Sequence, residues 1–85
     1  MKEINLIITE ILKEGFSEID INEDQEDSNL IELGLDSISL IRIIVAIEER
    51  FGIEIPDEYL VLSEIDTINK ISHITYDMLD RQGNF

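Results

Sequence analysis

Apolar residues recur at helical spacing in three separate stretches of the chain, with polar residues between them. In the first stretch, residues 2–14, they follow the three- and four-residue steps of an amphipathic helix. They are Ile4, Ile7, Ile8, Ile11 and Leu12. Gly15 is a typical stop signal, and Lys13 lies in the last turn, where a cation suits the helix dipole. The pattern predicts a first helix that packs on a core.

The second stretch, residues 37–51, is apolar on nearly every side. One face of the predicted helix is assigned to the core and carries Leu40, Ile44, Ile47 and Phe51. The opposite face carries an aliphatic stripe with charged neighbours: Ile38, Ile41 and Val45, flanked by Arg42, Glu48 and Glu49. Such a stripe favours a docking surface for a partner. The alternative is that the preceding loop or the next helix covers part of it. Gly52 ends this helix.

Residues 16–35 form a long connection rich in Asp, Glu, Asn and Ser, and a loop of this length needs anchors. The apolar candidates are Phe16, Ile19, Leu30, Ile31, Leu33 and Leu35. Three acidic or amide residues fall at the first, third and fifth positions of a calcium-loop pattern, namely Asp20, Asn22 and Asp24. However, Gln25 replaces the required glycine, and Ile31 replaces the required glutamate. We therefore expect a solvated acidic loop and no metal site.

Between the second and the last helix, the pattern predicts a short helix over about 58–62. Pro56 disfavours helix at the residue before it, and Asp57 can cap the segment that follows. Tyr59 or Leu60 would then pack inward.

Asp66 and Thr67 offer an N-cap for a last helix over about 67–80. Its apolar stripe consists of Ile68, Ile71, Ile74 and Met78. His73 falls on the far side of this stripe, so we expect it to be exposed and assign it no role. The predicted fold is all-α: a small four-helix bundle with a long loop between helices one and two.

The net charge of the chain indicates which kinds of partner it can attract. With 20 acidic and 6 basic residues among 85, the formal net charge is −14. Nucleic acid and anionic lipid surfaces repel such a chain, whereas a basic surface patch attracts it. The chain has no cysteine, so thiol chemistry requires an added group. The absence of a signal-peptide pattern and of a membrane-spanning apolar run favours the cytoplasm, with no membrane partner. We also expect a monomer.

The entrance to the second predicted helix carries the candidate chemistry. Gly34 predicts a turn, Asp36 is a preferred N-cap residue, and Ser37 then opens the helix. The Ser37 hydroxyl would lie beside the positive end of the helix dipole, where backbone N–H groups have no intrahelical partner. A phosphate attached there would be stabilised by roughly 0.3–1 kcal/mol at an exposed helix end.

Residues 33–38 read Leu-Gly-Leu-Asp-Ser-Ile, the helix after them ends Glu-Glu-Arg-Phe-Gly, and residues 53–58 read Ile-Glu-Ile-Pro-Asp-Glu. In this order and spacing, the chain resembles the acyl carrier and peptidyl carrier protein family over about its whole length. The resemblance implies that Ser37 carries 4′-phosphopantetheine, transferred from coenzyme A by a phosphopantetheinyl transferase. It also implies that a loading enzyme attaches an acyl or aminoacyl group to the thiol of this arm as a thioester. The carrier then passes the group to downstream synthases or transferases. Asp36 would cap the helix and face the transferase.

In such carriers, partner enzymes grip the second helix. The docking residues that the resemblance and the stripe together predict are Leu35, Ile38, Ile41, Arg42, Val45 and Glu48. Fatty-acid members of the family commonly carry an acidic residue where this chain has Arg42. This departure favours a polyketide or nonribosomal-peptide pathway over fatty-acid synthesis.

The residues do not favour an enzyme. No histidine lies at a predictable distance from Ser37 to act as a base, and nothing resembles the Gly-x-Ser-x-Gly elbow of hydrolases. We expect one free-standing carrier domain over residues 1–85, with a frayed tail at 81–85. The alternative function is a non-catalytic interaction module of the same fold that uses only the face of the second helix.

Overall fold

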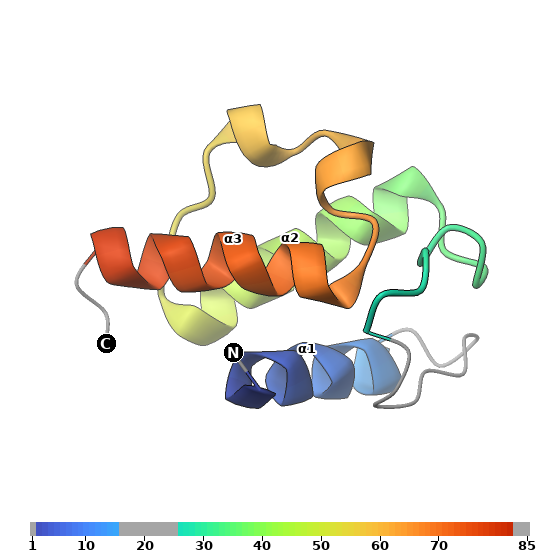
Figure 1. The fold of residues 1–85 in the computed structure, drawn as a ribbon, viewed down its shortest axis with the longest axis horizontal. Coiled ribbons are helices and arrows are strands. Elements are labelled where there is room, and N and C mark those ends of the chain that lie inside the picture. The colour runs from blue at the N-terminus through green and yellow to red at the C-terminus, as the bar shows by residue number, and fades with distance from the viewer. Residues whose placement is uncertain (1, 16–25, 83–85) are drawn as a thin grey trace.

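The computed structural model describes residues 2–15 and 26–82, which form an all-α structure (Figure 1). Three long helices, α1 (Lys2–Gly15), α2 (Ser37–Phe51) and α3 (Ile68–Arg81), account for most of it. Each begins and ends within one residue of the range that the hydrophobic pattern predicts. No strand occurs among the described residues. The predicted fold class is therefore confirmed.

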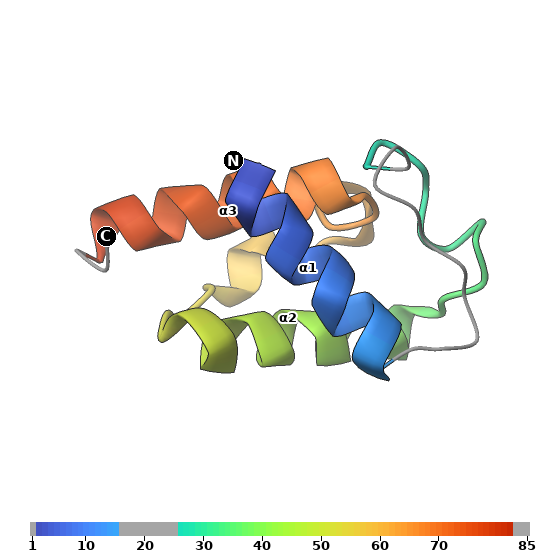
Figure 2. The same cartoon turned by 90° about the horizontal axis from the view of Figure 1, so that it is seen from below.

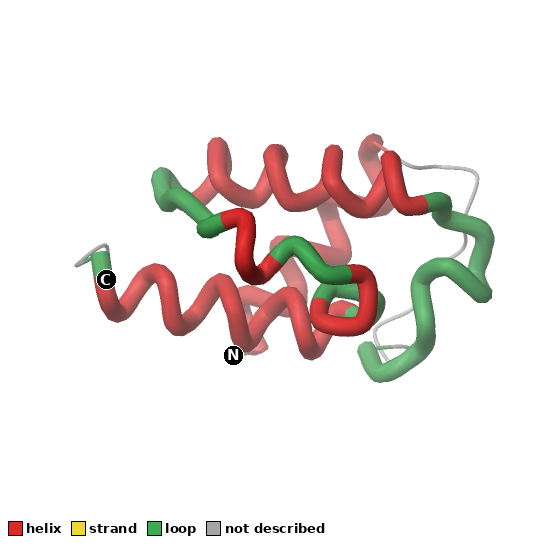
Figure 3. The backbone as a smooth tube through the Cα atoms, turned by 90° about the horizontal axis from the view of Figure 1, so that it is seen from above, coloured by secondary structure: helices red, strands yellow, loops and turns green. Residues whose placement is uncertain are grey.

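The connection from α2 to α3 differs from the single short helix expected over 58–62. It contains two separate 3₁₀ turns, η2 (Asp57–Tyr59) and η3 (Leu62–Glu64). Val61 has an extended backbone between them, as suits a β-branched residue, and it interrupts any continuous helix. The connection lies over the space between α2 and α3 (Figure 3).

The start of η2 also departs from the expectation. Pro56 occupies the N-cap position, and no side chain caps the turn, so Asp57 is not an N-cap residue. Tyr59 and Leu60 are partly buried and pack against the core, as predicted. These two contacts hold the turn in place without a capping hydrogen bond.

Helix α1 crosses the other two helices, with its first half near α3 and its last turn near the start of α2 (Figure 2). The core that the helices and their connections enclose is dominated by isoleucine. Its buried residues are Ile4, Ile8, Leu12, Leu30, Leu35, Leu40, Ile43, Ile44, Ile47, Ile53, Ile55, Ile65, Ile68, Ile71, Ile74, Met78 and Leu79. Burying one such side chain fully contributes roughly 1.5–3 kcal/mol relative to leaving it exposed.

The predicted core faces of the helices agree with this list. All four stripe residues of α3 are buried, and His73 is exposed. On α2, three of the four assigned residues are buried, and Phe51 packs partly buried against the core. Ile43 is buried as well, which widens the core face of α2 beyond the prediction. On α1, Ile7 and Ile11 are only partly buried.

Polar side chains also enter the contact between α1 and α3, which the hydrophobic pattern did not predict. Asn5 and Ser72 are buried, and the Ser72 hydroxyl donates a hydrogen bond to Asn5 Oδ1. Asn5 Nδ2 donates to Asn69 Oδ1 at 3.0 Å. These bonds satisfy groups whose burial would otherwise cost free energy.

Three further observations bear on the sequence-based expectations. Gly52 ends α2 in the left-handed region, at φ +66°, as a glycine C-cap does. Phe16, Ile19 and the calcium-pattern positions 20, 22 and 24 lie outside the described residues. None of the described helices has both the length and the apolar character needed to cross a bilayer.

Candidate functional site

The start of α2 is a capped helix terminus. The Asp36 backbone is extended, and its carboxylate Oδ1 accepts a hydrogen bond from the Ser39 N–H at 2.7 Å. The Asp36 carbonyl accepts the first helical hydrogen bond, from the Leu40 N–H at 3.1 Å. Ser37 is therefore the first residue of the helix, as the sequence predicts.

The turn before Asp36 is organised by Asn29. Its side-chain oxygen accepts hydrogen bonds from the N–H groups of Ile31 at 2.9 Å and Glu32 at 3.2 Å. An asparagine that bonds the backbone two and three residues ahead is a local turn-forming device. Gly34 then adopts φ +121°, a conformation that L residues rarely adopt, so a glycine is needed there.

Two leucines fix this turn to the core. Leu30 and Leu35 are 0% and 2% exposed, and the Leu35 N–H donates to the Leu30 carbonyl at 3.1 Å. Leu33 packs against the core as well. By contrast, Ile31 is 40% exposed, so its predicted role as an anchor is wrong. Two buried points close together thus set where the chain emerges toward Ser37.

Ser37 is exposed, and its nearest acidic neighbour is already engaged. The hydrogen bond from the Ser39 N–H is the main cause that lowers the pKa of Asp36, followed by a bond with the Ser39 side chain. The positive charge of Arg42 lowers this pKa further. A carboxylate with a lowered pKa is a weak base. Asp36 is therefore suited to cap the helix and poorly suited to deprotonate the Ser37 hydroxyl.

The aliphatic stripe of α2 faces outward. Ile38, Ile41 and Val45 are 70%, 37% and 46% exposed, and Arg42 is exposed beside them. Branched aliphatic side chains gain free energy when they leave water. The stripe therefore offers a partner apolar area that the fold itself does not use.

Two of the predicted docking residues do not belong to this exposed surface. Leu35 is buried in the core, where it serves only its other predicted role as a loop anchor. Glu48 is partly buried, and its carboxylate accepts a hydrogen bond from the Ile55 N–H at 2.9 Å. Glu48 thus holds the extended link after α2. Docking through Leu35 is wrong because its side chain is enclosed.

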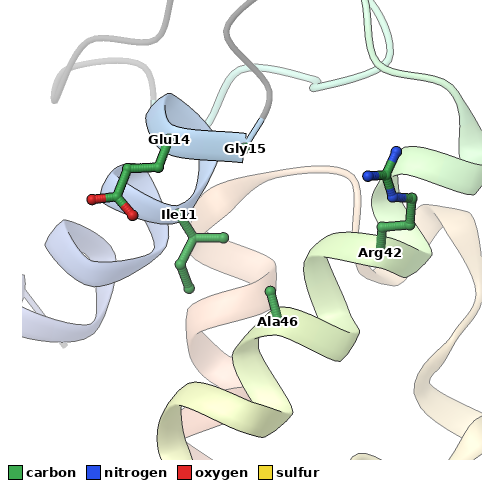
Figure 4. Close-up of a pocket in the computed structure, with 5 residues that line it drawn as sticks. All are labelled: Ile11, Glu14, Gly15, Arg42 and Ala46. Carbon is green, nitrogen blue, oxygen red and sulfur yellow. The ribbon is translucent and has the colours of Figure 1, made fainter.

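An open cleft of about 360 Å³ lies between α2 and the last turn of α1 (Figure 4). Ile11 and Ala46 face it from the two helices, and Glu14 and Arg42 lie on opposite sides of it. The cleft carries one charge of each sign on its borders and a small apolar floor. It extends the outward face of α2 toward α1.

Sequence reasoning missed the tertiary partner of Asn29. The Asn29 amide nitrogen donates to Asp66 Oδ2 at 3.3 Å, across 37 residues of sequence. The turn-forming half of Asn29 has a local signal, because asparagine is a common turn residue. Its contact with Asp66 has none, since it depends on how α3 is placed.

This arrangement suits an attached phosphate group. The first turn of a helix presents N–H groups that no intrahelical carbonyl can reach, and its dipole favours a negative charge. Ser37 lies on that turn and is exposed, so a group bonded to its oxygen extends into solvent. Across the described parts of the chain, no three His, Cys, Asp or Glu side chains cluster in a way that could hold a metal ion.

Comparison with known proteins bears on the same residues. Residues 7–74 match a family described as a phosphopantetheine attachment site. The chain is 39% identical over 57 residues to the acyl carrier protein of Helicobacter acinonychis, covering 67% of this chain and 68% of that protein. It is 35% identical over 74 residues to the acyl carrier protein of Campylobacter lari, covering 80% of this chain and 95% of that protein. No solved structure matches the chain.

Proposed function

Since the chain belongs to the phosphopantetheine-binding carrier proteins, a non-catalytic family, we propose that Ser37 is its point of attachment for 4′-phosphopantetheine. The observation that carries this proposal is an exposed serine at the first position of a capped helix. Because Asp36 supplies the cap, the serine oxygen is not needed for one.

The attachment is a phosphoryl transfer from coenzyme A. The Ser37 oxygen forms a bond to the phosphorus of the 4′-phosphopantetheine half, and the pyrophosphate P–O bond breaks, so adenosine 3′,5′-bisphosphate leaves. The serine proton passes to a base on the transferase, because Asp36 is a weak base and is already hydrogen-bonded. Once attached, the group supplies a thiol that holds the cargo as a thioester. The chain contributes no thiol of its own.

The exposed stripe supports a role in docking. Ile38, Ile41 and Val45 lie on the helix that Ser37 opens, so a partner that covers them is brought close to the serine. The net charge of −14 steers basic partners to the protein and accelerates encounter. The proposed partners are a phosphopantetheinyl transferase, a loading enzyme and the downstream enzymes that use the cargo.

We further propose an acyl cargo, because the relatives are named acyl carrier proteins. A polyketide or nonribosomal-peptide pathway in place of fatty-acid synthesis is part of the proposal. It is supported by the cation Arg42 beside the exposed stripe of a chain that is strongly acidic overall. Identification of the group bound to protein purified from its own host tests both statements. A fatty acyl chain of the length found in membrane lipids contradicts the pathway.

The attachment is tested with purified protein, coenzyme A and a transferase of broad specificity. We expect intact-mass measurement to show addition of one phosphopantetheine group to the wild type and none to Ser37→Ala. Ser63→Ala is the matched control, because it removes another exposed serine hydroxyl, in η3. It should be modified like the wild type.

Modification that persists in Ser37→Ala overturns the proposal. An unmodified wild type that still binds partner enzymes through the α2 stripe supports the alternative, an interaction module of the same fold.

A further inference from the structure

The segment that leads into Ser37 is tied to the start of α3. The Leu30 N–H donates to the Asp66 carbonyl at 2.7 Å, and Asn29 Nδ2 donates to Asp66 Oδ2 at 3.3 Å. Asp66 directly precedes Thr67, the N-cap residue of α3. The residue before the N-cap of α3 thus holds the segment that leads into α2.

Both the oxygen and the nitrogen of the Asn29 side-chain amide form hydrogen bonds. Its oxygen accepts from the N–H groups of Ile31 and Glu32 and so shapes the turn. Its nitrogen donates to Asp66 and so fixes that turn to α3. Rotation of this one side chain would break both sets of bonds, which makes the turn and its attachment a single unit.

Asp66 is itself held from the other side. Its Oδ1 lies 2.9 Å from Lys70 Nζ, and the same Nζ donates to the Ser63 carbonyl at 2.7 Å. The Asp66 side chain is only 16% exposed, so its bonds are screened less by water than those at the surface. One carboxylate oxygen faces the cation and the other faces Asn29.

A path of hydrogen bonds and backbone bonds therefore runs from Asp66, just before α3, to the start of α2. It passes from Asp66 to Asn29 and Leu30, and from the Leu30 carbonyl to the Leu35 N–H. Leu35 is bonded in sequence to Asp36, whose carboxylate caps α2. The path ends at the cap residue directly before Ser37, so its effect on the Ser37 oxygen is one of placement.

We propose that Asn29 and Asp66 are positioning residues for the reaction at Ser37, an inference that rests on the proposed function. Their contact keeps the turn ordered before the transferase binds. Without the contact, the transferase must order the turn during binding, which costs affinity and leaves the chemical step intact once bound. The expected result is a higher KM for the carrier, by about three- to tenfold, with kcat within about twofold of the wild type.

The first variant is Asn29→Asp. It keeps an acceptor for the N–H groups of Ile31 and Glu32 but loses the donor and sets a carboxylate against Asp66. The double variant Asn29→Asp with Asp66→Asn reverses donor and acceptor and restores the net charge. We expect it to return KM toward the wild-type value. A role in overall stability alone would not predict rescue of KM, because Asp66→Asn also removes the ion pair with Lys70.

Kinetics are measured well below the melting temperature, and amide hydrogen exchange is followed at Gly34 to Ser37. We expect faster exchange there in Asn29→Asp and slower exchange again in the double variant. Glu32→Gln, an exposed change in the same turn, shows how the transferase responds to charge alone. If Asn29→Asp does not fold, Asp66→Ala serves in its place. It removes the acceptor of the same hydrogen bond and should raise KM by a similar factor.

The outcomes separate the two proposals. A wild type that the transferase does not modify overturns the proposed function, and the positioning role falls with it. A wild type that is modified, together with a folded Asn29→Asp protein of unchanged KM and unchanged exchange, overturns only the positioning role. A rise in KM that the double variant does not reverse also overturns it.

Discussion

Helices α2 and α3 have almost equal length, yet they use their apolar residues differently. The seven buried residues of α3 include all its apolar side chains except Tyr76. Helix α2 buries four residues and leaves the aliphatic stripe Ile38, Ile41 and Val45 exposed. The fold therefore needs nearly all of the apolar surface of α3 and only one side of α2. The apolar surface that the fold does not use therefore lies on α2, the helix that begins at Ser37.

The starts of α2 and α3 show the same difference between a group that the fold uses and a group that it leaves accessible. At α3 the Thr67 hydroxyl caps the helix by accepting from the Lys70 N–H at 3.1 Å, and Thr67 is 9% exposed. At α2 the preceding residue, Asp36, provides the cap, and Ser37 is exposed. A hydroxyl that caps a helix is committed to the fold. A hydroxyl one position later remains accessible to another protein.

The largest expected effect is a loss of stability when a buried side chain of α3 is truncated. Ile71 on α3 is 0% exposed, so Ile71→Ala should lower the free energy of unfolding by about 2–5 kcal/mol. Ile38→Ala on the exposed stripe should change it by less than about 0.5 kcal/mol. Denaturant unfolding monitored by circular dichroism measures both. Equal losses would mean that the stripe is packed within the folded protein.

The next effect concerns docking. Val45 and Tyr76 are both 46% exposed, on α2 and α3 respectively. Val45→Asp should lower kcat/KM for modification by the transferase about tenfold or more, because it places a charge in the apolar contact. Tyr76→Asp is the matched control and should leave kcat/KM near the wild-type value. Equal losses from both variants would contradict a docking role specific to α2.

A smaller effect is expected from the cap of α3. Thr67→Ala removes the acceptor for the Lys70 N–H and should cost about 1 kcal/mol of unfolding free energy. Thr67→Ser keeps the hydroxyl and should recover most of that loss. Because Thr67 is remote from the α2 stripe in sequence and role, neither variant should alter the kcat of Ser37 modification. A fall in kcat in a variant that remains folded would contradict the view that the Thr67 hydroxyl serves only the fold.

The smallest effect is the pH dependence of the α2 cap. The pKa of Asp36 lies below its ordinary value of 3.8, so the folded protein favours the charged carboxylate. This contribution to stability is fully present above the ordinary pKa and is lost as pH falls through the folded pKa. Asp36→Asn also caps but carries no charge. Thermal melts should show the wild type ahead at neutral pH, with the difference closing in acid. A difference that widens in acid contradicts this sign.

Local patterns predicted the three long helices and the Asp36 cap before Ser37, because each depends on neighbours in sequence. Apolar spacing defines a helix face, and an aspartate before a serine defines a cap within one turn. The same reasoning failed for residues 57–64, where weak local preferences are outweighed by packing. It also failed for Leu35 as a docking residue and for Ile31 as a loop anchor, since apolar character alone does not reveal which loop residues meet the core.

The sequence by itself determined the helices, the charge of the protein and the serine on which the proposed chemistry depends. The tertiary structure alone decided that Ile43 joins the core face of α2, that Glu48 serves the link after α2, and that Asn29 meets Asp66 across 37 positions. Helix periodicity and caps arise from bonds a few residues long, which the sequence encodes directly. Exposure and long-range contacts arise only when the helices pack, because each side chain then competes with every other for the same interior.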